Sequence, residues 1–403
     1  MPRLLSGAAR RRLAAVPVAV ALTSLAACGG GSLSQSGGGG GATADDSTPV
    51  KIGLSVPLSG VYAPLGEDMT QGFELYLEQN DGQLGGRDVD LVTADEGEGP
   101  QSGVPATTRL VTDSQVSAVV GIVNSATALG LKDTFVGSEV PLIIANAGAN
   151  EITADASPYI WRTSFTNGGV GASIGAAVAE EVGDGSVYVI TADYAAGKEQ
   201  TGGFKEAFEA AGGTIAGESF TPFGTTSDWQ PYLNEIRNSG ATAVFSFYAG
   251  SEAVNFVKQY STFGLAETTP LYGTGFLTEG GVLDAQGEAA TGIKTALHYS
   301  HTVDNPVNAE FVEAYEAAYG EAPTVYAVQA YDAARVLDLA VEQAETTDGP
   351  GIAAALAEVG DIESPRGTWR FDENHDPEQP YYLREVQPVD GTVANVVLHE
   401  LSE

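Results

Sequence analysis

Two hydroxyl side chains, Ser125 and Thr127, follow a fully apolar segment, residues 118–123 (AVVGIV), at the start of a predicted helix. In open α/β sheets, ligands bind outside the carboxyl ends of the strands. The start of a helix also offers unpaired backbone N–H groups and the positive end of the helix dipole, which favour an anion. These residues therefore predict a cradle for a carboxylate, with capping of the helix by Ser125 as the alternative role.

Residues that enzymes use are present, but they are not arranged as a catalytic or metal site. Gly197-Lys198 lacks the upstream Gly and the following hydroxyl residue of a phosphate-binding loop. His298 and His301 are three residues apart without a third ligand clustered beside them, so hinge or surface positions are the better interpretation. We therefore expect no enzyme activity, no metal ion and no cofactor.

The segment FDENHDP, residues 371–377, resembles part of a calcium-binding loop. Asp372, Asn374 and Asp376 alternate as oxygen ligands do in such loops. A complete loop also needs a Gly and a distal Glu at fixed places, and this segment lacks them. We therefore expect a solvated turn here.

Secondary structure must position these side chains, and from Val50 onward short apolar segments alternate with amphipathic ones. Continuous apolar strands alternating with helices predict a parallel sheet covered on both faces. There are too many units for one six-stranded sheet, so the sequence predicts an α/β fold with two Rossmann-like lobes. The expected strands are 50–56, 88–94, 118–123, 141–145, 187–191, 241–247 and 271–273, and the expected helices are 66–80, 105–115, 125–136, 169–181, 198–211, 229–238 and 252–260.

The last hundred residues follow a different pattern. Helices are expected at 308–319, 326–343 and 350–359. Three strands separated by turns then follow, at 367–371, 382–386 and 394–398. This is a meander rather than a series of βαβ units, so it must complete a sheet that an earlier part of the chain builds.

Composition excludes several classes of protein. The 403 residues include 18 Lys and Arg against 53 Asp and Glu, a formal net charge of −35. A nucleic-acid-backbone binder needs a basic surface, so that class is excluded. The chain is 43% hydrophobic, which is enough for a packed core, yet it has no apolar run of the ~18 residues that would indicate a membrane span. Its single Cys excludes an internal disulfide.

The amino terminus reads as an export signal followed by a tether. Residues 1–27 carry Arg but no acid and contain an apolar run, 13–27, of the length of a secretory signal. The run ends at Cys28 and resembles the lipobox of bacterial lipoproteins, which implies lipid attachment at Cys28; an ordinary signal peptide with an incidental Cys is the alternative. Residues 28–49 are rich in Gly and Ser and predict a flexible tether. We therefore expect an extracytoplasmic protein held to the membrane by lipid alone.

Several short segments stand out along the chain: 50–66 (VKIGLSVPLSGVYAPLG), 121–127 (GIVNSAT), 144–150 (IANAGAN), 161–163 (WRT), 193–197 (DYAAG) and 323–333 (PTVYAVQAYDA). In this order they resemble the landmarks of type I periplasmic binding proteins, specifically the branch that binds leucine, isoleucine and valine. The resemblance runs from about residue 50 to about residue 400.

The resemblance implies two lobes joined by a three-segment hinge. We expect crossings near 165–167, 297–301 and 363–367. The N-terminal lobe would then comprise 50–165 with 299–363, and the C-terminal lobe 167–298 with 365–403.

The resemblance also implies a function. Such a protein is the receptor of an ABC importer, whose lobes close on a small molecule and deliver it to permease and ATPase subunits. A ligand sensor of the same fold that signals to a membrane partner is the alternative. We expect a monomer that binds no nucleic acid.

Four further residues gain a role through the resemblance. Ala147 and Ala149 occupy positions that supply backbone and hydroxyl contacts to an amino acid, with Ala149 replacing the usual hydroxyl residue. Asn146 is either a substitute donor or a turn residue. Tyr194 stands where the family places a ligand-contacting Tyr, with packing in the hinge as the alternative; a Tyr there can stack on a ligand and donate one hydrogen bond.

One departure from the family pattern bears on the ligand. Gly275 takes the place of the acid that pairs with an amino acid's ammonium group, although a slip in the correspondence would put Glu279 there. A buried ammonium without an anion costs several kcal/mol, so we expect a hydrophobic or aromatic carboxylate, or else a branched-chain amino acid. The expected apolar walls are Tyr62, Leu65, Tyr248 and Phe276.

Overall fold

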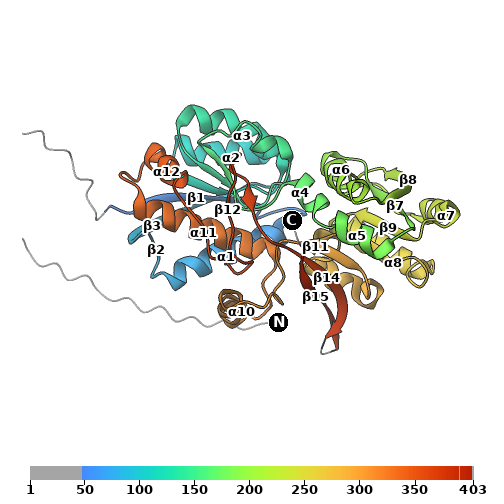
Figure 1. The fold of residues 1–403 in the computed structure, drawn as a ribbon. Helices are drawn as coiled ribbons and strands as arrows, with labels where there is room; N and C mark the ends of the chain where they lie inside the picture. Colours follow the sequence, from blue (N-terminus) through green and yellow to red (C-terminus); the bar gives the residue numbers. More distant parts are fainter. Residues whose placement is uncertain (1–47, 390, 402–403) are drawn as a thin grey trace, which may run out of the picture. The chain divides into compact units, whose positions relative to one another are not determined.

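The computed structural model describes residues 48–389 and 391–401, which form two large sheets flanked by helices (Figure 1). The α/β fold predicted from the sequence is confirmed. The predicted signal peptide, Cys28 and nearly all of the predicted tether lie outside the described residues.

The first sheet has the strand order β2-β3-β1-β4-β5-β6. It is parallel except for β2, which pairs antiparallel with β3. Parallel strands end at the same edge, so the loops that follow β1, β3, β4 and β5 meet there. The strands are β1 (Val50–Val56), β2 (Gln83–Leu84), β3 (Arg87–Asp95), β4 (Ala118–Gly121), β5 (Leu142–Ile144) and β6 (Ile160–Arg162).

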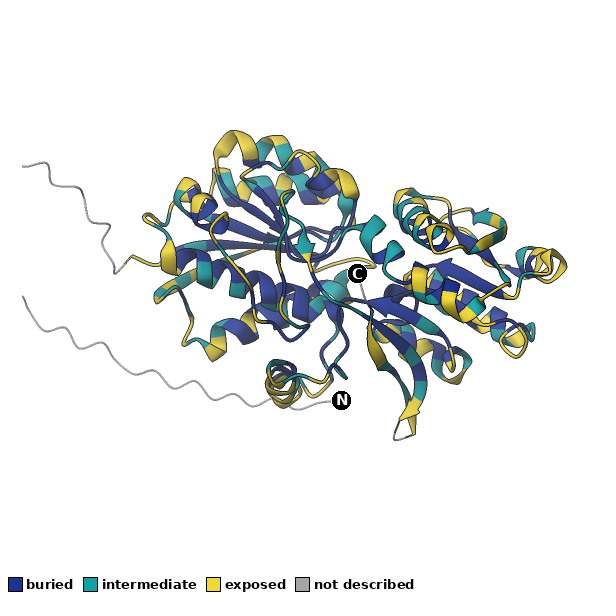
Figure 2. Cartoon of the chain, in the orientation of Figure 1, coloured by how far each residue is buried: buried dark blue, intermediate teal, exposed yellow. Residues whose placement is uncertain are grey.

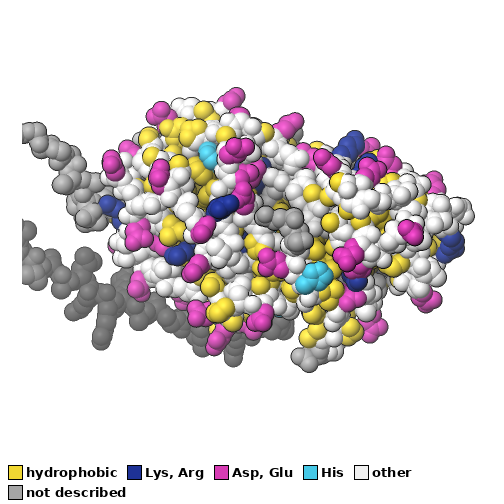
Figure 3. Space-filling model, viewed as in Figure 1, with side chains coloured by type: hydrophobic (Ala, Val, Ile, Leu, Met, Phe, Trp, Pro, Cys, Tyr) yellow, Lys and Arg dark blue, Asp and Glu magenta, His cyan; other side chains and the backbone are white. Residues whose placement is uncertain are grey.

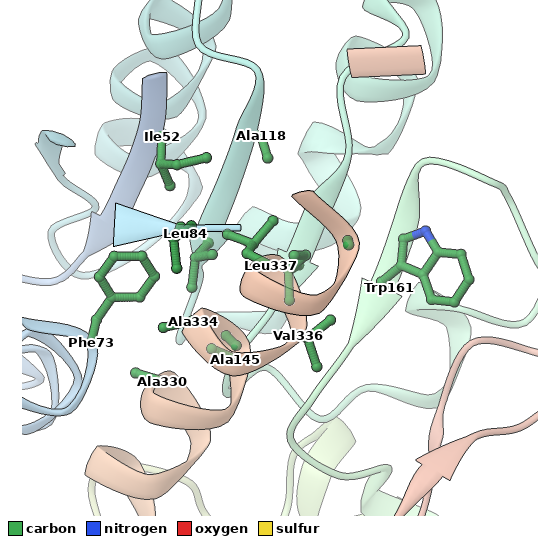
Figure 4. Packing of buried hydrophobic residues seen from close by; sticks show 14 of the residues in the cluster. Ile52, Phe73, Leu84, Ala118, Ala145, Trp161, Ala330, Ala334, Val336 and Leu337 are labelled. Atoms are coloured by element: carbon green, nitrogen blue, oxygen red, sulfur yellow. The ribbon is translucent and has the colours of Figure 1, made fainter. Parts of the chain in front are cut away.

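Helices cover both faces of the first sheet. One face packs Ile52 of β1 against Phe73 and Leu337 in a single buried cluster (Figure 4). The other face packs Val119 and Ile144 against helices α2 and α3. The helices of this lobe are α1 (Ala63–Gln79), α2 (Pro100–Thr112), α3 (Ser125–Ser138), α10 (Pro306–Tyr319), α11 (Val325–Gln343) and α12 (Gly349–Leu356), with a 3-10 turn η1 (Asn150–Ile152).

The second sheet has the strand order β15-β14-β11-β10-β9-β7-β8. β14 and β15 are antiparallel and complete a parallel sheet, as the meander pattern predicted. Its strands are β7 (Ser186–Ala192), β8 (Thr214–Thr221), β9 (Ala243–Phe247), β10 (Leu271–Thr274), β11 (Lys294–Leu297), β14 (Tyr381–Val389) and β15 (Thr392–Leu401).

Side chains alternate between the two faces of this second sheet. Along β7, Val187 and Val189 face one buried cluster while Tyr188 and Ile190 face the other, as a strand buried on both sides requires. The central strands β7, β9, β10 and β11 are accordingly among the most buried parts of the chain (Figure 2). The helices are α4 (Asn167–Ala172), α5 (Gly175–Val182), α6 (Ala195–Ala210), α7 (Gln230–Ser239), α8 (Gly250–Thr262) and α9 (Gly281–Gln286), with 3-10 turns η2 (Gly275–Thr278) and η3 (Gly287–Ala290).

The chain passes between the sheets after β6, after β11 and before β14. The third passage lies later than the expected 363–367. Trp369 still belongs to the buried cluster of the first lobe, and the Phe371 ring lies 4.8 Å from that of Trp161. The short pair β12 (Arg370–Phe371) and β13 (Pro377–Glu378) follows, so the chain enters the second sheet only after Pro380. Residues 365–380 were therefore wrongly assigned to the C-terminal lobe.

Two elements differ from the sequence expectation for local reasons. The helix expected at 169–181 is split between α4 and α5, where the Ser173 hydroxyl donates to the carbonyl of Val170 at 2.8 Å and competes with the helical bonds. Strand β8 was not predicted because, as the edge strand, it alternates exposed and half-buried residues and has no apolar run.

Candidate ligand-binding site

Ser125 begins α3, just beyond the carboxyl end of β4. Its neighbour Asn124 caps the helix by accepting the N–H of Thr127 at 3.1 Å, so capping is not the role of Ser125. The Oγ of Ser125 accepts the N–H of Ala149 at 3.2 Å, which leaves its O–H free to donate. This hydroxyl and the first-turn N–H groups of Ser125 and Ala126 form a donor set suited to a carboxylate.

A buried acid that the sequence reasoning missed lies behind these donors. Glu96 is fully buried, and its two oxygens accept the N–H groups of Val123 and Asn124 at 2.8 and 2.9 Å. Burial raises the pKa of Glu96 to about 7, although the hydrogen bonds oppose the rise. The signal for this residue was the acidic run DEGEG after the predicted strand at 88–94.

Thr127 differs from the expectation. It is fully buried, and its side chain hydrogen-bonds to Glu96. Thr127 therefore supports the start of α3. It does not share with Ser125 the predicted role of a ligand donor.

The same acidic segment holds the loop between β1 and α1. Asp95 accepts the N–H of Leu58 at 2.8 Å, and Glu98 accepts the N–H of Val61 at 3.0 Å. Tyr62 follows directly and is half-buried. Burial raises the pKa of the Tyr62 phenol, and the charges of Glu96 and Glu98 raise it further, so this ring lies near the acidic segment.

Asn146 belongs to a buried series of hydrogen bonds. Its amide donates to Gln329 at 2.9 Å, and Gln329 donates to the Nε2 of His298 at 3.0 Å. The neutral His298 ring therefore carries its proton on Nδ1. This series explains the burial of Asn146, and it does not support the role of a substitute ligand donor.

The remaining predicted residues of the first lobe contribute backbone and apolar surface. Ala147 is buried, and its N–H bonds to the carbonyl of Ile122 at 2.9 Å. Ala149 is buried beside the Ser125 hydroxyl. Leu65 lies half-buried in the first turn of α1. The loop after β5 therefore meets the start of α3 through main-chain groups.

Tyr194 leads an aromatic group in the second lobe. Its ring stacks on Phe223 with centroids 4.2 Å apart, and Phe247 lies 6.1 Å away. Burial raises the pKa of Tyr194, and the Tyr62 phenol raises it further. The two tyrosines come from different lobes, and the effect of Tyr62 on this pKa indicates that the two phenols lie near each other.

Tyr248 does not belong with these rings. It is buried in the core of the second lobe, 4.7 Å from the Phe256 ring, and its hydroxyl lies 3.1 Å from that of Thr221. Its neighbour Phe247 belongs to the cluster with Phe276. Adjacent side chains at the end of a strand point to opposite faces, so Phe247, and not the predicted Tyr248, lies on the side of Tyr194.

Gly275 is tightly packed within the second lobe, whereas Glu279 links the second lobe to the first. A Cβ on Gly275 would lie 2.5 Å from both Arg384 Nη2 and Leu297 Cβ, so no side chain fits there. Glu279 is buried; it pairs with Arg384 at 2.9 Å and accepts the N–H of Val325 at 2.9 Å. Glu279 is therefore already satisfied, and the idea that it pairs with a ligand ammonium is not supported.

Phe276 lies at the centre of an aromatic cluster built from both lobes. Its ring is 4.7 Å from Phe165 and 6.4 Å from Tyr326. Phe165 also lies 5.9 Å from His298. Phe276 is buried, so it forms an apolar floor beside the hinge.

Three cavities, of 490, 350 and 540 Å³, lie in other places. The largest lies between Asp68 and Asn395 and is lined mostly by polar and acidic residues. Neither Ser125 nor Tyr194 lines any of the three. The candidate site is therefore defined by the contacts of the strand-end residues.

The FDENHDP segment has structural partners in the first lobe. Asp376 pairs with Arg162 at 3.0 Å, and His375 stacks on Trp161 at 3.7 Å, so the segment is a docked loop and not the solvated turn expected. Within residues 48–389 and 391–401, no cluster of three or more His, Cys, Asp and Glu side chains could hold a metal ion.

The pattern Gly-x-Ser-x-Gly, typical of the nucleophile elbow of serine hydrolases, occurs at residues 171–175. In hydrolases the Ser of this pattern sits on a sharp turn from a strand into a helix. Here Ser173 lies between helices α4 and α5. The pattern therefore lacks the structural context of a catalytic serine.

Acidic side chains are spread over the face drawn in Figure 3, with few Lys and Arg among them. This agrees with the 53 acids and 18 bases of the sequence. Of the helices in the described part of the chain, none combines the length and hydrophobicity of a membrane span.

The fold thus consists of two α/β lobes whose strand-end loops carry the candidate donor set and the aromatic rings. A family model described as periplasmic binding protein matches residues 49–392, and the chain therefore belongs to that family. The resemblance drawn from the sequence is confirmed.

Several relatives share most of the chain. A Leu/Ile/Val-binding protein homolog from Brucella melitensis is 33% identical and covers 86% of this chain and 90% of its own length. An ABC-transporter solute-binding protein from R. palustris, solved with benzoate, is 37% identical with a TM-score of 0.78, covering 88% of this chain and 98% of that one. A branched-chain amino acid transporter protein from Streptococcus pneumoniae, solved with isoleucine, is 26% identical with a TM-score of 0.75, covering 87% and 99%.

Proposed function

We propose that this protein is the extracytoplasmic receptor of an ABC importer for a small aromatic carboxylate. The observation that carries the proposal is the donor set at the start of α3 together with the commitment of Glu279 to Arg384 and Val325. A ligand carboxylate finds partners there, whereas an ammonium finds no acid at the position that the family uses.

The aromatic groups support a ring-shaped ligand. Tyr194, Phe223 and Phe247 form a stacked group in the second lobe, and Phe276 packs on Phe165 beside the hinge. Aromatic rings favour offset or edge contacts with another ring at 4.5–7 Å. The relative solved with benzoate is 37% identical, against 26% for the one solved with isoleucine, which agrees with this choice.

Calorimetry with benzoate, 4-hydroxybenzoate, leucine and isoleucine tests the ligand class. We expect the two aromatic acids to bind at least tenfold more tightly than either amino acid, because the ligand ammonium would lose a charged hydrogen bond worth ~1.5–3 kcal/mol. Tight binding of leucine with no heat from the aromatic acids would refute the proposal.

A lipid anchor would keep the receptor close to a permease in the same membrane, and we assign the attachment to Cys28 after removal of residues 1–27. Replacing Cys28 with Ala should leave the precursor uncleaved or release the protein from the membrane fraction. Ligand binding by the purified variant should be unchanged, because the matched family region begins at residue 49. A C28A variant that is processed and stays membrane-bound would contradict the assignment.

A further inference from the structure

Glu96 places a carboxylate at the helix end that the proposed ligand also uses. Its oxygens accept the N–H groups of Val123 and Asn124, and the next two residues, Ser125 and Ala126, supply the proposed ligand donors. A helix end carries only about half of a positive charge. It cannot neutralise two full carboxylates, so a bound ligand and an ionised Glu96 repel each other.

Among the residues that the structure describes, those that act on Glu96 offer hydrogen bonds but no compensating positive charge. On the same segment, the charge of Asp95 raises the pKa of Glu96, and the exposed Glu98 lies two residues further on. From α3, the side chain of Thr127 hydrogen-bonds to the carboxylate. Tyr62 lies just before α1, and the charge of Glu96 raises the pKa of its phenol.

Helix α2 closes the remaining side of Glu96. A Cβ on Gly103 would lie 2.6 Å from Thr127 Cγ2 and 3.0 Å from Glu96 Cγ, so the helix packs directly on the acid. The hydroxyl of Ser102 donates to the Glu96 carbonyl at 2.8 Å. Water is thereby kept from a carboxylate that is fully buried.

We propose that Glu96 couples ligand capture to proton uptake: a carboxylate bound at the start of α3 draws one proton from solvent onto Glu96. This inference rests on the proposed function, because it needs an anionic group at Ser125. The proton relieves the repulsion between two carboxylates at one helix end, and no other covalent change is involved.

Two adjacent acids show how specific this arrangement is. Hydrogen bonds from Leu58, Ser59 and Gly97 lower the pKa of the exposed Asp95. Burial instead raises the pKa of Glu96 to about 7. Neighbouring carboxyl groups whose environments separate their pKa values often divide their roles in this way. Asp95 stays charged and holds the loop, whereas Glu96 can change its charge near neutral pH.

The direction of the pH effect follows from linkage. Below about pH 7 Glu96 is protonated in both free and bound protein, so the affinity is highest and constant. Above about pH 7 the free protein is ionised and must take up a proton to bind, so the affinity falls as pH rises. The fall is limited to about tenfold per pH unit for one linked proton.

Titration of benzoate into the protein from about pH 6 to about pH 8.5 tests the coupling, in pairs of buffers with different ionisation heats. Benzoate stays ionised over this range, so it adds no pH dependence of its own. We expect affinity to fall about tenfold or more across the range, with proton uptake rising from near zero towards one per ligand. The uptake is measured on the unmodified protein, so it does not depend on the folding of any variant.

Variants locate the proton. Glu96→Gln should abolish most of the pH dependence. Glu98→Gln, two residues away, should keep it. Asp68 is a second acid whose pKa is raised by burial, to about 6, but it lies beside the 540 Å³ cavity and not at α3. Asp68→Asn should therefore also keep the pH dependence of binding.

Each other outcome is decisive. Benzoate binding with a flat pH profile overturns the coupling and leaves the proposed function standing. No binding of any aromatic acid at any pH overturns the proposed function and this inference with it. Leucine binding that strengthens as pH rises would identify ionised Glu96 as the partner of a ligand ammonium, and would overturn both.

Discussion

The hinge and the start of α3 both bury charged groups, but they handle them differently. At the hinge, Arg366 pairs with Asp332 at 2.8 Å with both side chains fully buried, and Arg384 pairs with Glu279 at 2.9 Å. At the start of α3, Glu96 is equally buried but receives only hydrogen bonds.

The difference teaches what each region is built to do. A buried pair links two segments, and removing one partner strands the other charge, so such pairs act on stability. A buried acid without a cation becomes neutral instead, at a pH set by its surroundings. The hinge should therefore control folding and the α3 start should control binding.

Breaking a hinge pair should have the largest effect. Asp332→Asn leaves Arg366 buried without its anion, so we expect a loss of about 3–5 kcal/mol in the free energy of unfolding. Denaturant unfolding measures it. Asp193→Asn removes half of an exposed pair with Lys198 and should change stability by less than about 1 kcal/mol. Equal losses in the two variants would erase the contrast between buried and exposed pairs.

Removing the Ser125 hydroxyl should act on binding. Ser125→Ala deletes a donor to the ligand carboxylate, a charged hydrogen bond worth ~1.5–3 kcal/mol, so affinity for benzoate should fall at least tenfold. Calorimetry measures this. Ser138→Ala, at the other end of α3, is the matched control and should bind normally. Unchanged affinity in S125A would place the ligand carboxylate elsewhere.

The hinge histidine sharpens the comparison through pH. Burial lowers the pKa of His298 well below its ordinary value, and Arg366 and Arg384 lower it further. As pH falls through the ordinary pKa of histidine, His298 takes up a proton in the unfolded chain but stays neutral in the native state. The free energy of unfolding therefore decreases as pH falls below that value.

His298→Gln removes this loss, which is limited to about 1.4 kcal/mol per pH unit. Between about pH 7.5 and about pH 5.5 the variant should lose less stability than the unmodified protein, as urea unfolding at the two pH values would show. His399→Gln is the control, since His399 is exposed. Parallel losses in the unmodified protein and H298Q would mean that His298 is protonated in the native state.

The smallest effect should come from Tyr248. Tyr248→Phe removes the hydroxyl contact with Thr221 and should cost about 1 kcal/mol of stability without changing ligand affinity. Tyr194→Ala, in contrast, should weaken binding because it removes the ring that stacks on Phe223. Thermal unfolding and calorimetry on both variants would test this division. Weaker binding by Y248F would return Tyr248 to the ligand site.

Local sequence predicted the elements that carry the site. The apolar run at 118–123 and the hydroxyl residue after it placed Ser125 at a strand end and a helix start, because strand and helix periods are local properties of the chain. Regular alternation of the two also determined the α/β class. The order of the family motifs added the two-lobe organisation.

Long-range packing decided the rest. Glu96 became a buried acid because Gly103 of α2 lets that helix pack on it, and the N–H groups that it binds lie 27 and 28 residues further along the chain. Glu279 is not a candidate partner for a ligand ammonium because it already pairs with Arg384, 105 residues away. A local pattern states which residues can share an element, but which distant charge faces which backbone group depends on how the lobes pack together.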